Sequence, residues 1–328
     1  KGPSLYMPEV VSPMGRETDH LYMVILWIVI VIFVITEGML VYSLFAFRDR
    51  PGHKARFFHG STFIEVLLAL FPSLILLYLT VASGSMWNDL KIKRTNDKGA
   101  VHIQVLAEQF SWNFRYPGAD GVFGTADDVI SVGEMALPAD KTVVMHISAK
   151  DVIHSFFIPE ARVKQDAVPG LLTKMWFRVD HMPVWDRATG KRVLLDTEAY
   201  NASEVALTGY EFKSEPKKGK GAFFQAADSK MIGLMDYSYA RSENTPIWVV
   251  KNGAFSTVSA EPQYIRHHFE IGCAQLCGTL HYAMRGTVLA LTGAEFDRWL
   301  AEQQADPTLQ AKWAEIWDKY HPEFNRIL

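Results

Sequence analysis

The sequence predicts a membrane-anchored all-β protein, in which a two-helix transmembrane hairpin is followed by a β-sandwich with an insertion. Two long apolar runs, 21–47 and 62–82, lie near the start of the 328-residue chain. Short alternating runs separated by turn residues begin at Val101, as expected of strands in a sandwich. The stretch from about 183 to 262 departs from this rhythm, so we expect it to be an insertion within the sandwich.

Each apolar run is long enough to cross a bilayer as a helix, which takes about 20 residues. Glu37 is the only charged residue of the first run, and Glu65 is the only one of the second. The second run also contains Pro72, which packed neighbours can accommodate by satisfying the freed backbone groups. A signal peptide would have a shorter apolar core and would not be followed by a second span. The runs therefore predict a hairpin of two membrane helices.

The segment between the two runs, 48–56, is short and basic. Cytoplasmic loops are enriched in Lys and Arg, so both outer ends of the hairpin are expected outside the cytoplasm. Basic residues after the second run blur this signal, but long domains translocate with little regard to charge. The expected organisation is an N-terminal extracytoplasmic segment, the hairpin, the sandwich domain and a helical tail, over residues 1–20, 21–83, 84–300 and 301–328.

Glu65 lies near the cytoplasmic end of the second predicted helix. An ionisable group in a membrane helix costs free energy unless it faces water or protein. Two interpretations follow from its position. The side chain either takes up protons for a partner subunit or simply reaches the membrane surface.

The polar domain is predicted from strand-like runs with turn residues between them. Short strands at this spacing are typical of an antiparallel sandwich or barrel. The tail from Ala294 has helical periodicity and predicts a packing helix. The clearest runs are 101–106, 141–147, 172–179 and 286–291.

Charge and loop composition limit the ligands of this domain. The formal net charge is −3, so no basic surface indicates nucleic-acid binding. The acidic, glycine-rich stretch 118–128 resembles a calcium loop but lacks the ligand count of an EF-hand. A tight acidic hairpin loop is the alternative, and calcium binding is weakly supported.

A group of metal-ligand residue types lies near the C-terminus. Cys273 and Cys277 are the only cysteines, His281 follows four residues later, and Met284 follows three after that. Thiolate and thioether sulfurs together with imidazole select copper over harder cations. His154, far upstream, is a fifth candidate ligand.

Other uses of the two cysteines fit less well. A structural zinc site would use four Cys or His ligands in paired knuckles. A disulfide is possible in an oxidising compartment, but it leaves the spacing of His281 and Met284 to chance. A mononuclear blue-copper site needs one cysteine. Two bridging thiolates suit two copper ions better.

The pattern Cys273-x3-Cys277-x3-His281-x2-Met284, with His154 upstream, resembles the binuclear CuA motif of subunit II of the haem-copper cytochrome c oxidases. Two more stretches, 150–170 and 59–65, are similar to the same family. The resemblance implies that the sandwich is cupredoxin-like and that both cysteines bridge two coppers. It also implies the remaining ligands of each copper: His154 with Met284 for one, and His281 with the backbone carbonyl of Gln275 for the other.

The resemblance further implies the function. Such a subunit accepts electrons from a cytochrome c-type donor, or another periplasmic carrier, and passes them to haem in subunit I. There oxygen is reduced to water, coupled to proton translocation. Subunit III is a further implied partner. The implied location is the bacterial cytoplasmic (inner) membrane, crossed twice, with the copper domain on the periplasmic side. Glu65 would lie at the mouth of a proton-uptake path.

Two departures from the family pattern affect the implied sites. Gln275 stands where the family often has a Glu that helps to hold magnesium at the subunit interface, so this metal is weakly supported. Phe110 stands where the family has a Trp thought to receive the electron, so Phe110 and the nearby Trp112 are both candidates for that role.

Two alternative functions remain open at this level. The same module could serve a copper-containing nitric oxide reductase, which only the partner's haem chemistry would distinguish. A membrane-anchored copper carrier is the other alternative, although carriers bind one Cu(I) in an exposed site. The chain has no Cys-x-x-Cys-His motif, so the donor haem is expected on another protein.

Overall fold

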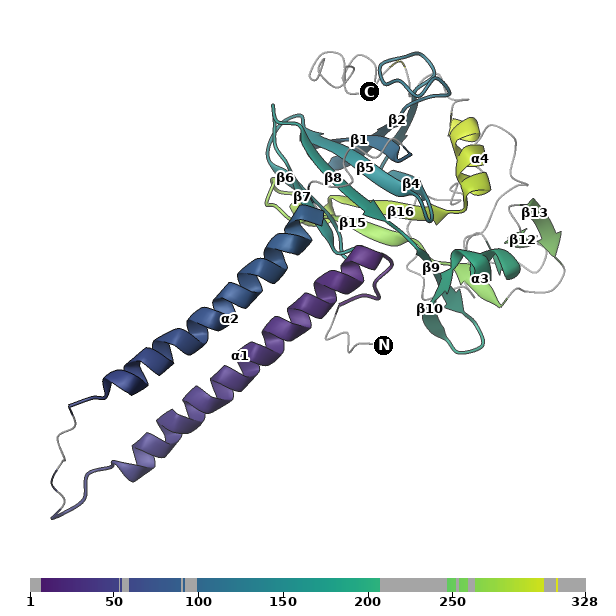
Figure 1. Ribbon diagram of the computed structural model, residues 1–328. Helices are drawn as coiled ribbons and strands as arrows, with labels where there is room; N and C mark the ends of the chain where they lie inside the picture. Colours follow the sequence, from purple (N-terminus) through teal and green to yellow (C-terminus); the bar gives the residue numbers. More distant parts are fainter. Residues whose placement is uncertain are drawn as a thin grey trace. The chain divides into compact units, whose positions relative to one another are not determined.

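The computed structural model describes residues 7–52, 54, 59–89, 91, 99–206, 247–251, 254–258, 263–303 and 311. The chain divides into two compact units (Figure 1): residues 16–93 form one, and residues 1–15 together with 94–328 form the other. Most of the expected tail, 301–328, lies outside the described residues, as does much of the expected insertion.

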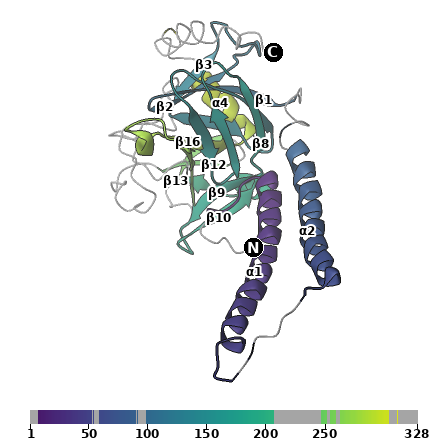
Figure 2. The ribbon, with the colours of Figure 1, turned by 90° about the vertical axis from the view of Figure 1, so that its left-hand side faces the viewer.

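The first unit is the predicted hairpin. Its helices, α1 (Pro13–Ala46) and α2 (Thr62–Asn88), run alongside each other in opposite directions (Figures 1 and 2). Helix α1 begins well before the apolar run because Ser12 caps it. The backbone N–H of Gly15 donates to Ser12 Oγ at 2.9 Å, and proline is favoured at the first helical position. The apolar stretches of both helices leave their side chains unburied, as membrane helices do.

The second unit contains the predicted sandwich, made of two five-stranded sheets in the orders β3-β2-β1-β5-β8 and β4-β16-β15-β6-β7. The four clearest strand-like runs are confirmed as β1, β5, β8 and β16. The first sheet comprises β1 (Val101–Glu108), β2 (Ser111–Tyr116), β3 (Val129–Val132), β5 (Thr142–Ala149) and β8 (Thr173–Arg178). The second comprises β4 (Glu134–Pro138), β6 (His154–Ile158), β7 (Val163–Ala167), β15 (Phe269–Cys273) and β16 (Arg285–Leu291).

The sandwich is mixed rather than antiparallel, so that part of the expectation was wrong. Strand β1 pairs with β5 in parallel, and β16 pairs with β4 in parallel. Parallel neighbours need a crossover connection. Here β2, β3 and β4 lie between β1 and β5 in the chain, and β4 belongs to the opposite sheet. The chain therefore returns to β5 in the same direction as β1.

The core lies between the two sheets. Trp112 of β2 meets Phe156 of β6 edge to face, with ring centroids 5.2 Å apart, and both are fully buried. Helix α4 (Gly293–Gln303) confirms the packing helix expected from the periodicity near Ala294. Its Trp299 is fully buried against Tyr116 at 5.1 Å. The expected domain boundary after residue 300 thus falls inside a helix that belongs to the core.

The described residues of the expected insertion, 183–262, contribute together with flanking residues to a third sheet in the order β10-β9-β14-β11-β12-β13 (Figure 1). Its elements are β9 (His181–Asp186), β10 (Lys191–Asp196), α3 (Thr197–Ala202), β11 (Val205–Ala206), β12 (Ile247–Lys251), β13 (Ala254–Val258) and β14 (Tyr264–Arg266). Arg266 joins this sheet to its neighbours through a buried ion pair with Glu295 of α4 and a 2.9 Å hydrogen bond to the Tyr200 hydroxyl of α3.

A short strap before α1, residues 7–12, packs on the sandwich and belongs to the same unit. Val11 is fully buried, its N–H donates to the carbonyl of Glu160 at 3.0 Å, and its carbonyl accepts from the N–H of Asp180 at 3.1 Å. Ser12 Oγ donates to the carbonyl of Ala161 at 2.8 Å. The described residues of the expected N-terminal segment 1–20, from 7 onward, are therefore divided between this strap and the first turns of α1.

Candidate metal centre

The candidate ligands are brought together by two paired strands and the loop that follows one of them. Strand β15 ends at Cys273, and β16 begins directly after Met284. The intervening loop includes the 3-10 helix η3 (His281–Ala283). Strand β15 also pairs with β6, with Cys273 opposite Phe156. This pairing sets the cysteine loop beside His154, the first residue of β6.

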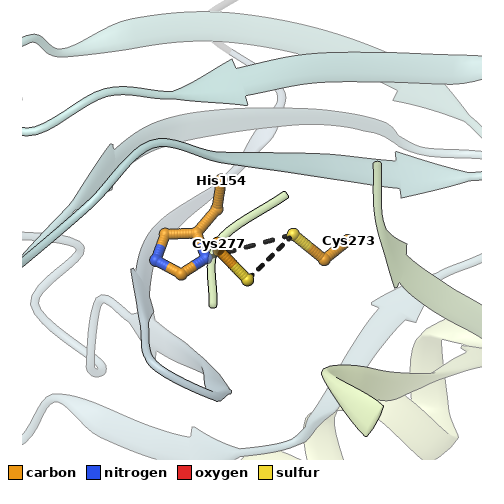
Figure 3. Close-up of side chains that lie close together, drawn as sticks. All are labelled: His154, Cys273 and Cys277. Carbon is orange, nitrogen blue, oxygen red and sulfur yellow. Dashed lines mark hydrogen bonds between the residues drawn. The ribbon is translucent and has the colours of Figure 1, made fainter. Parts of the chain in front are cut away.

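The five side chains form a connected cluster, part of which Figure 3 shows. Cys273 Sγ lies 3.8 Å from Cys277 Sγ and 3.9 Å from His154 Nδ1. Cys277 Sγ lies 3.5 Å from His281 Nδ1 and 3.8 Å from Met284 Sδ. His154, His281 and Met284 thus each lie beside one of the two sulfurs.

The backbone of Gln275, rather than its side chain, lies next to the sulfurs. Its carbonyl oxygen lies 3.2 Å from Cys273 Sγ, whereas its side chain is exposed. The backbone oxygen is therefore directed toward the sulfur cluster, in keeping with the role that the resemblance implied.

The donor set fits metal ions better than a disulfide. A disulfide holds its sulfurs about 2.05 Å apart, and both cysteines are free thiols at 3.8 Å. A tetrahedral ion with bonds of about 2.0–2.3 Å separates its ligand atoms by roughly 3.3–3.8 Å, close to the spacings here. Within the described part of the chain, His154, Cys273 and Cys277 are the one group of His, Cys, Asp or Glu that could hold a metal ion.

One side of the site is shielded from solvent. His154, Cys277 and Met284 are buried, and the His154 ring meets the Trp112 ring at 6.2 Å. Burial, reinforced by the neighbouring Cys273 sulfur, raises the pKa of the Cys277 thiol to about 11. A metal ion must displace this proton, because thiolates are the ligand form. Without a bound cation, Cys277 is therefore held as the neutral thiol.

Two residues that touch the ligands were not given roles from the sequence. Asp151 accepts a 2.9 Å hydrogen bond from His154 Nε2, and Gln109 Nε2 donates to the carbonyl of Cys277. Although partial burial opposes it, the hydrogen bonds from His154 and two backbone N–H groups lower the pKa of Asp151. The signal for Asp151 was its position three residues before a candidate ligand.

The two candidate electron-receiving residues differ in exposure. Trp112 is fully buried, whereas Phe110 is partly exposed beside the cysteine loop. A Cβ added at Gly278 would lie 3.0 Å from Phe110 Cζ. Only Phe110 of this pair therefore reaches both the surface and the loop that carries Cys277.

The remaining predicted sites lie elsewhere. Glu65 is in the first turn of α2, and its N–H donates to the carbonyl of Ser61 at 3.0 Å. In the acidic loop, Asp128 pairs with Arg115 and accepts from the N–H of Gly124 at 2.8 Å. Asp127 accepts from Thr125 Oγ1 at 2.6 Å. These internal bonds are typical of a tight acidic turn.

Comparisons with known proteins match both units of the chain. The family model for the cytochrome c oxidase subunit II transmembrane domain matches residues 2–86, and the model for its periplasmic domain matches residues 101–187. The alternative cytochrome c oxidase subunit 2 of Bradyrhizobium diazoefficiens is 26% identical over 46% of this chain and 62% of its own length. Cytochrome c oxidase subunit 2 of Cereibacter sphaeroides is 28% identical over 52% of this chain and 65% of its own length.

The chain therefore spans less than two thirds of the length of these relatives. Among solved structures, the periplasmic domain of subunit II of cytochrome oxidase from Bradyrhizobium japonicum is 16% identical, with a TM-score of 0.32, over 62% of this chain and 92% of that one.

The order of the parts agrees with these matches. Two helices of membrane-spanning length correspond to the transmembrane model. The periplasmic-domain model covers the sandwich strands from β1 to β8, including His154, and ends before the loop that carries the two cysteines. The protein crosses the membrane twice, and its polar part is a β-sandwich domain. On the strength of both matched domains, this chain belongs to the cytochrome c oxidase subunit II family.

Proposed function

We propose that this protein is the electron-transfer subunit of a respiratory haem-copper oxidase and holds a binuclear copper centre. The carrying observation is the pair of sulfurs 3.8 Å apart. A histidine nitrogen lies beside each sulfur, and a thioether lies beside one of them. Soft sulfur and imidazole ligands favour copper.

The roles of the ligands follow from their places in the cluster. Cys273 and Cys277 would bridge the ions, His154 and Met284 would complete one, and His281 with the carbonyl of Gln275 would complete the other. Such a centre takes up and releases one electron. The protein's part is to hold the ligands still: β15, β16 and β6 anchor both ends of the loop, and burial excludes water from His154 and Met284.

The proposed haem-binding partner is inferred from the residues of the two apolar runs. Neither apolar run, 21–47 or 62–82, contains a histidine, so haem would be bound by another subunit. Electrons would arrive from a c-type cytochrome or another periplasmic carrier and leave to haem in subunit I. Oxygen would be reduced to water there, coupled to proton translocation, and subunit III would complete the assembly.

The orientation and the proton role are part of the same proposal. The basic connector between α1 and α2 favours a cytoplasmic position for that end of the hairpin, which directs the β-domain to the periplasm. Glu65, in the first turn of α2, would then face the cytoplasmic side, where it would receive protons for the catalytic subunit.

Metal analysis and spectroscopy of the purified full chain in its native complex test this function. We expect two copper ions per chain and an electron paramagnetic resonance signal from one electron shared by both. Cys277→Ser should lose the signal and donor oxidation. Leu276→Ala, a change of an exposed neighbour in the same loop, should keep both. Zinc, a single copper ion, or normal donor oxidation by Cys277→Ser would contradict the proposal.

A further inference from the structure

The two ring nitrogens of His154 face different partners. Its Nδ1 lies 3.9 Å from Cys273 Sγ, on the side of the proposed copper centre. Its Nε2 lies 2.9 Å from the Asp151 carboxylate, and the histidine side chain is fully buried. A carboxylate accepts hydrogen bonds, so the proton of the neutral ring resides on Nε2 and the lone pair on Nδ1 is free for a metal.

Asp151 is itself held in place through both carboxylate oxygens. Oδ2 accepts from the backbone N–H of Gln109 at 2.7 Å, and Oδ1 accepts from the backbone N–H of Val152 at 2.7 Å. Lys150, the preceding residue, donates its N–H to the carbonyl of Ala107 at 2.9 Å. The carboxylate is therefore fixed relative to the end of β1 and cannot turn away from the His154 ring without breaking these bonds.

Residues 109 and 110, which follow β1, also contact the loop that carries Cys277. Gln109 Nε2 donates to the carbonyl of Cys277, and Phe110 lies against Gly278. Residues 109 and 110 thus contact the loop between Cys273 and Met284 directly. They are linked to the His154 ring through Asp151. This turn therefore connects the partly exposed Phe110 ring with both halves of the cluster.

We propose that Asp151 is a positioning residue of the copper centre, a role that rests on the proposed function. It fixes the tautomer and orientation of His154, strengthens Nδ1 as a donor, and ties that ligand to the Gln109–Phe110 turn. Metal-bound histidines commonly donate their second N–H to a carboxylate, which raises the basicity of the ligand. A negative charge behind the ring also favours the more positively charged, oxidised centre over the reduced one.

The test compares Asp151→Asn and Asp151→Ala with the wild-type full chain in its complex. Asparagine keeps the shape but removes the charge, and alanine removes the acceptor. Asp180→Asn is the matched control, because Asp180 accepts from His181 Nδ1 at the same 2.9 Å, without contact with the sulfurs. Copper affinity is measured by competition with a chelator, and the reduction potential by spectroscopic titration.

We expect Asp151→Asn to bind copper about 10- to 100-fold more weakly and to have a higher reduction potential. The Nε2–H proton of His154, followed by paramagnetic NMR, should exchange faster with solvent in Asp151→Ala. Asp180→Asn should match the wild type in all three measurements. Unchanged affinity and potential in Asp151→Asn would overturn the positioning role alone. A wild-type chain without copper would instead overturn the proposed function.

Discussion

His146 is a buried histidine whose surroundings keep it neutral. It lies on β5, and its Nε2 is 2.9 Å from Nδ1 of His102 on the neighbouring β1. Burial, together with His102 and Lys174, lowers the pKa of His146 to about 3. In the unfolded chain its pKa would be about 6.5. The unfolded state therefore binds this proton first as the pH falls, and stability is lost between about pH 6.5 and pH 3.

We expect His146→Gln to make the β-domain less sensitive to acid. Between pH 7 and pH 5 the wild-type residue lowers the free energy of unfolding by about 2 kcal/mol, and glutamine cannot contribute this loss. Denaturant unfolding of both chains in detergent, followed by tryptophan fluorescence at the two pH values, measures the difference. Equal losses in both chains would show that His146 is not the group responsible.

Phe110 and Trp112 are both candidates for receiving the electron, but only Phe110 reaches the surface. We expect Phe110→Ala to slow electron uptake from the donor on the order of tenfold, which corresponds to about 1.4 kcal/mol of lost contact. Trp112→Phe should leave the rate near normal and reduce stability by about 1–3 kcal/mol. Stopped-flow reduction of the copper centre and thermal unfolding separate the two effects. A slow Trp112→Phe with a normal Phe110→Ala would reverse the assignment.

At the scale of elements, the loop between Cys273 and Met284 depends on one glycine. Gly278 has a φ of +138°, and a Cβ there would lie 2.8 Å from Gln109 Nε2 and 3.0 Å from Phe110 Cζ. An L side chain at this position is strained by its backbone and has no space. The turn between Cys277 and His281 therefore requires glycine.

We expect Gly278→Ala to weaken copper binding, because strain of about 1–3 kcal/mol falls on the loop that holds the ligands. Gly272→Ala is the matched control, since a Cβ there meets nothing within 4 Å and the residue also adjoins a cysteine. Copper content after dialysis against a weak chelator compares them. Equal retention by both variants would mean that the loop tolerates the change.

Local patterns predicted the elements better than their pairing. Apolar runs with partial alternation identified β1, β5, β8 and β16, although every residue of β5 is buried in the folded chain. The parallel pairing of β1 with β5 depends on contacts distant in sequence, which periodicity does not contain. The hairpin of β9 and β10 did have a local signal: Asp186 accepts from the N–H of Ala188, and Gly190 has a positive φ.

The ligand cluster was predictable for a different reason. Four of the five candidate side-chain ligands lie within twelve residues, so a single loop brings them together and their spacing is informative. Asp151 was not assigned, because its role depends on which nitrogen of His154 faces the sulfurs. That orientation depends on contacts made only in the folded chain, such as the hydrogen bond from His154 Nε2 to Asp151, which the spacing of residues in the sequence does not contain.

At the scale of the whole molecule, the two units divide the proposed work between electrons and protons. We expect Glu65→Gln to slow turnover of the complete oxidase roughly tenfold or more, as loss of a positioned proton carrier does, without changing the copper signal. Glu198→Gln is the control, because Glu198 is also a first-turn glutamate, in α3 of the β-domain. Oxygen consumption and the copper spectrum are measured on the same samples. Unchanged turnover would leave Glu65 as a residue of the membrane surface.

The strap that contains Val11 determines which residues a water-soluble fragment of the β-domain must include. A fragment that starts at Val101 lacks the buried Val11 side chain. It also leaves the carbonyl of Glu160 and the N–H of Asp180 without their hydrogen bonds to Val11. Each such loss costs about 1–3 kcal/mol. The smallest stable excised domain is thus built from two separate stretches of chain, with residues 7–12 grafted back by a linker or added as a synthetic peptide.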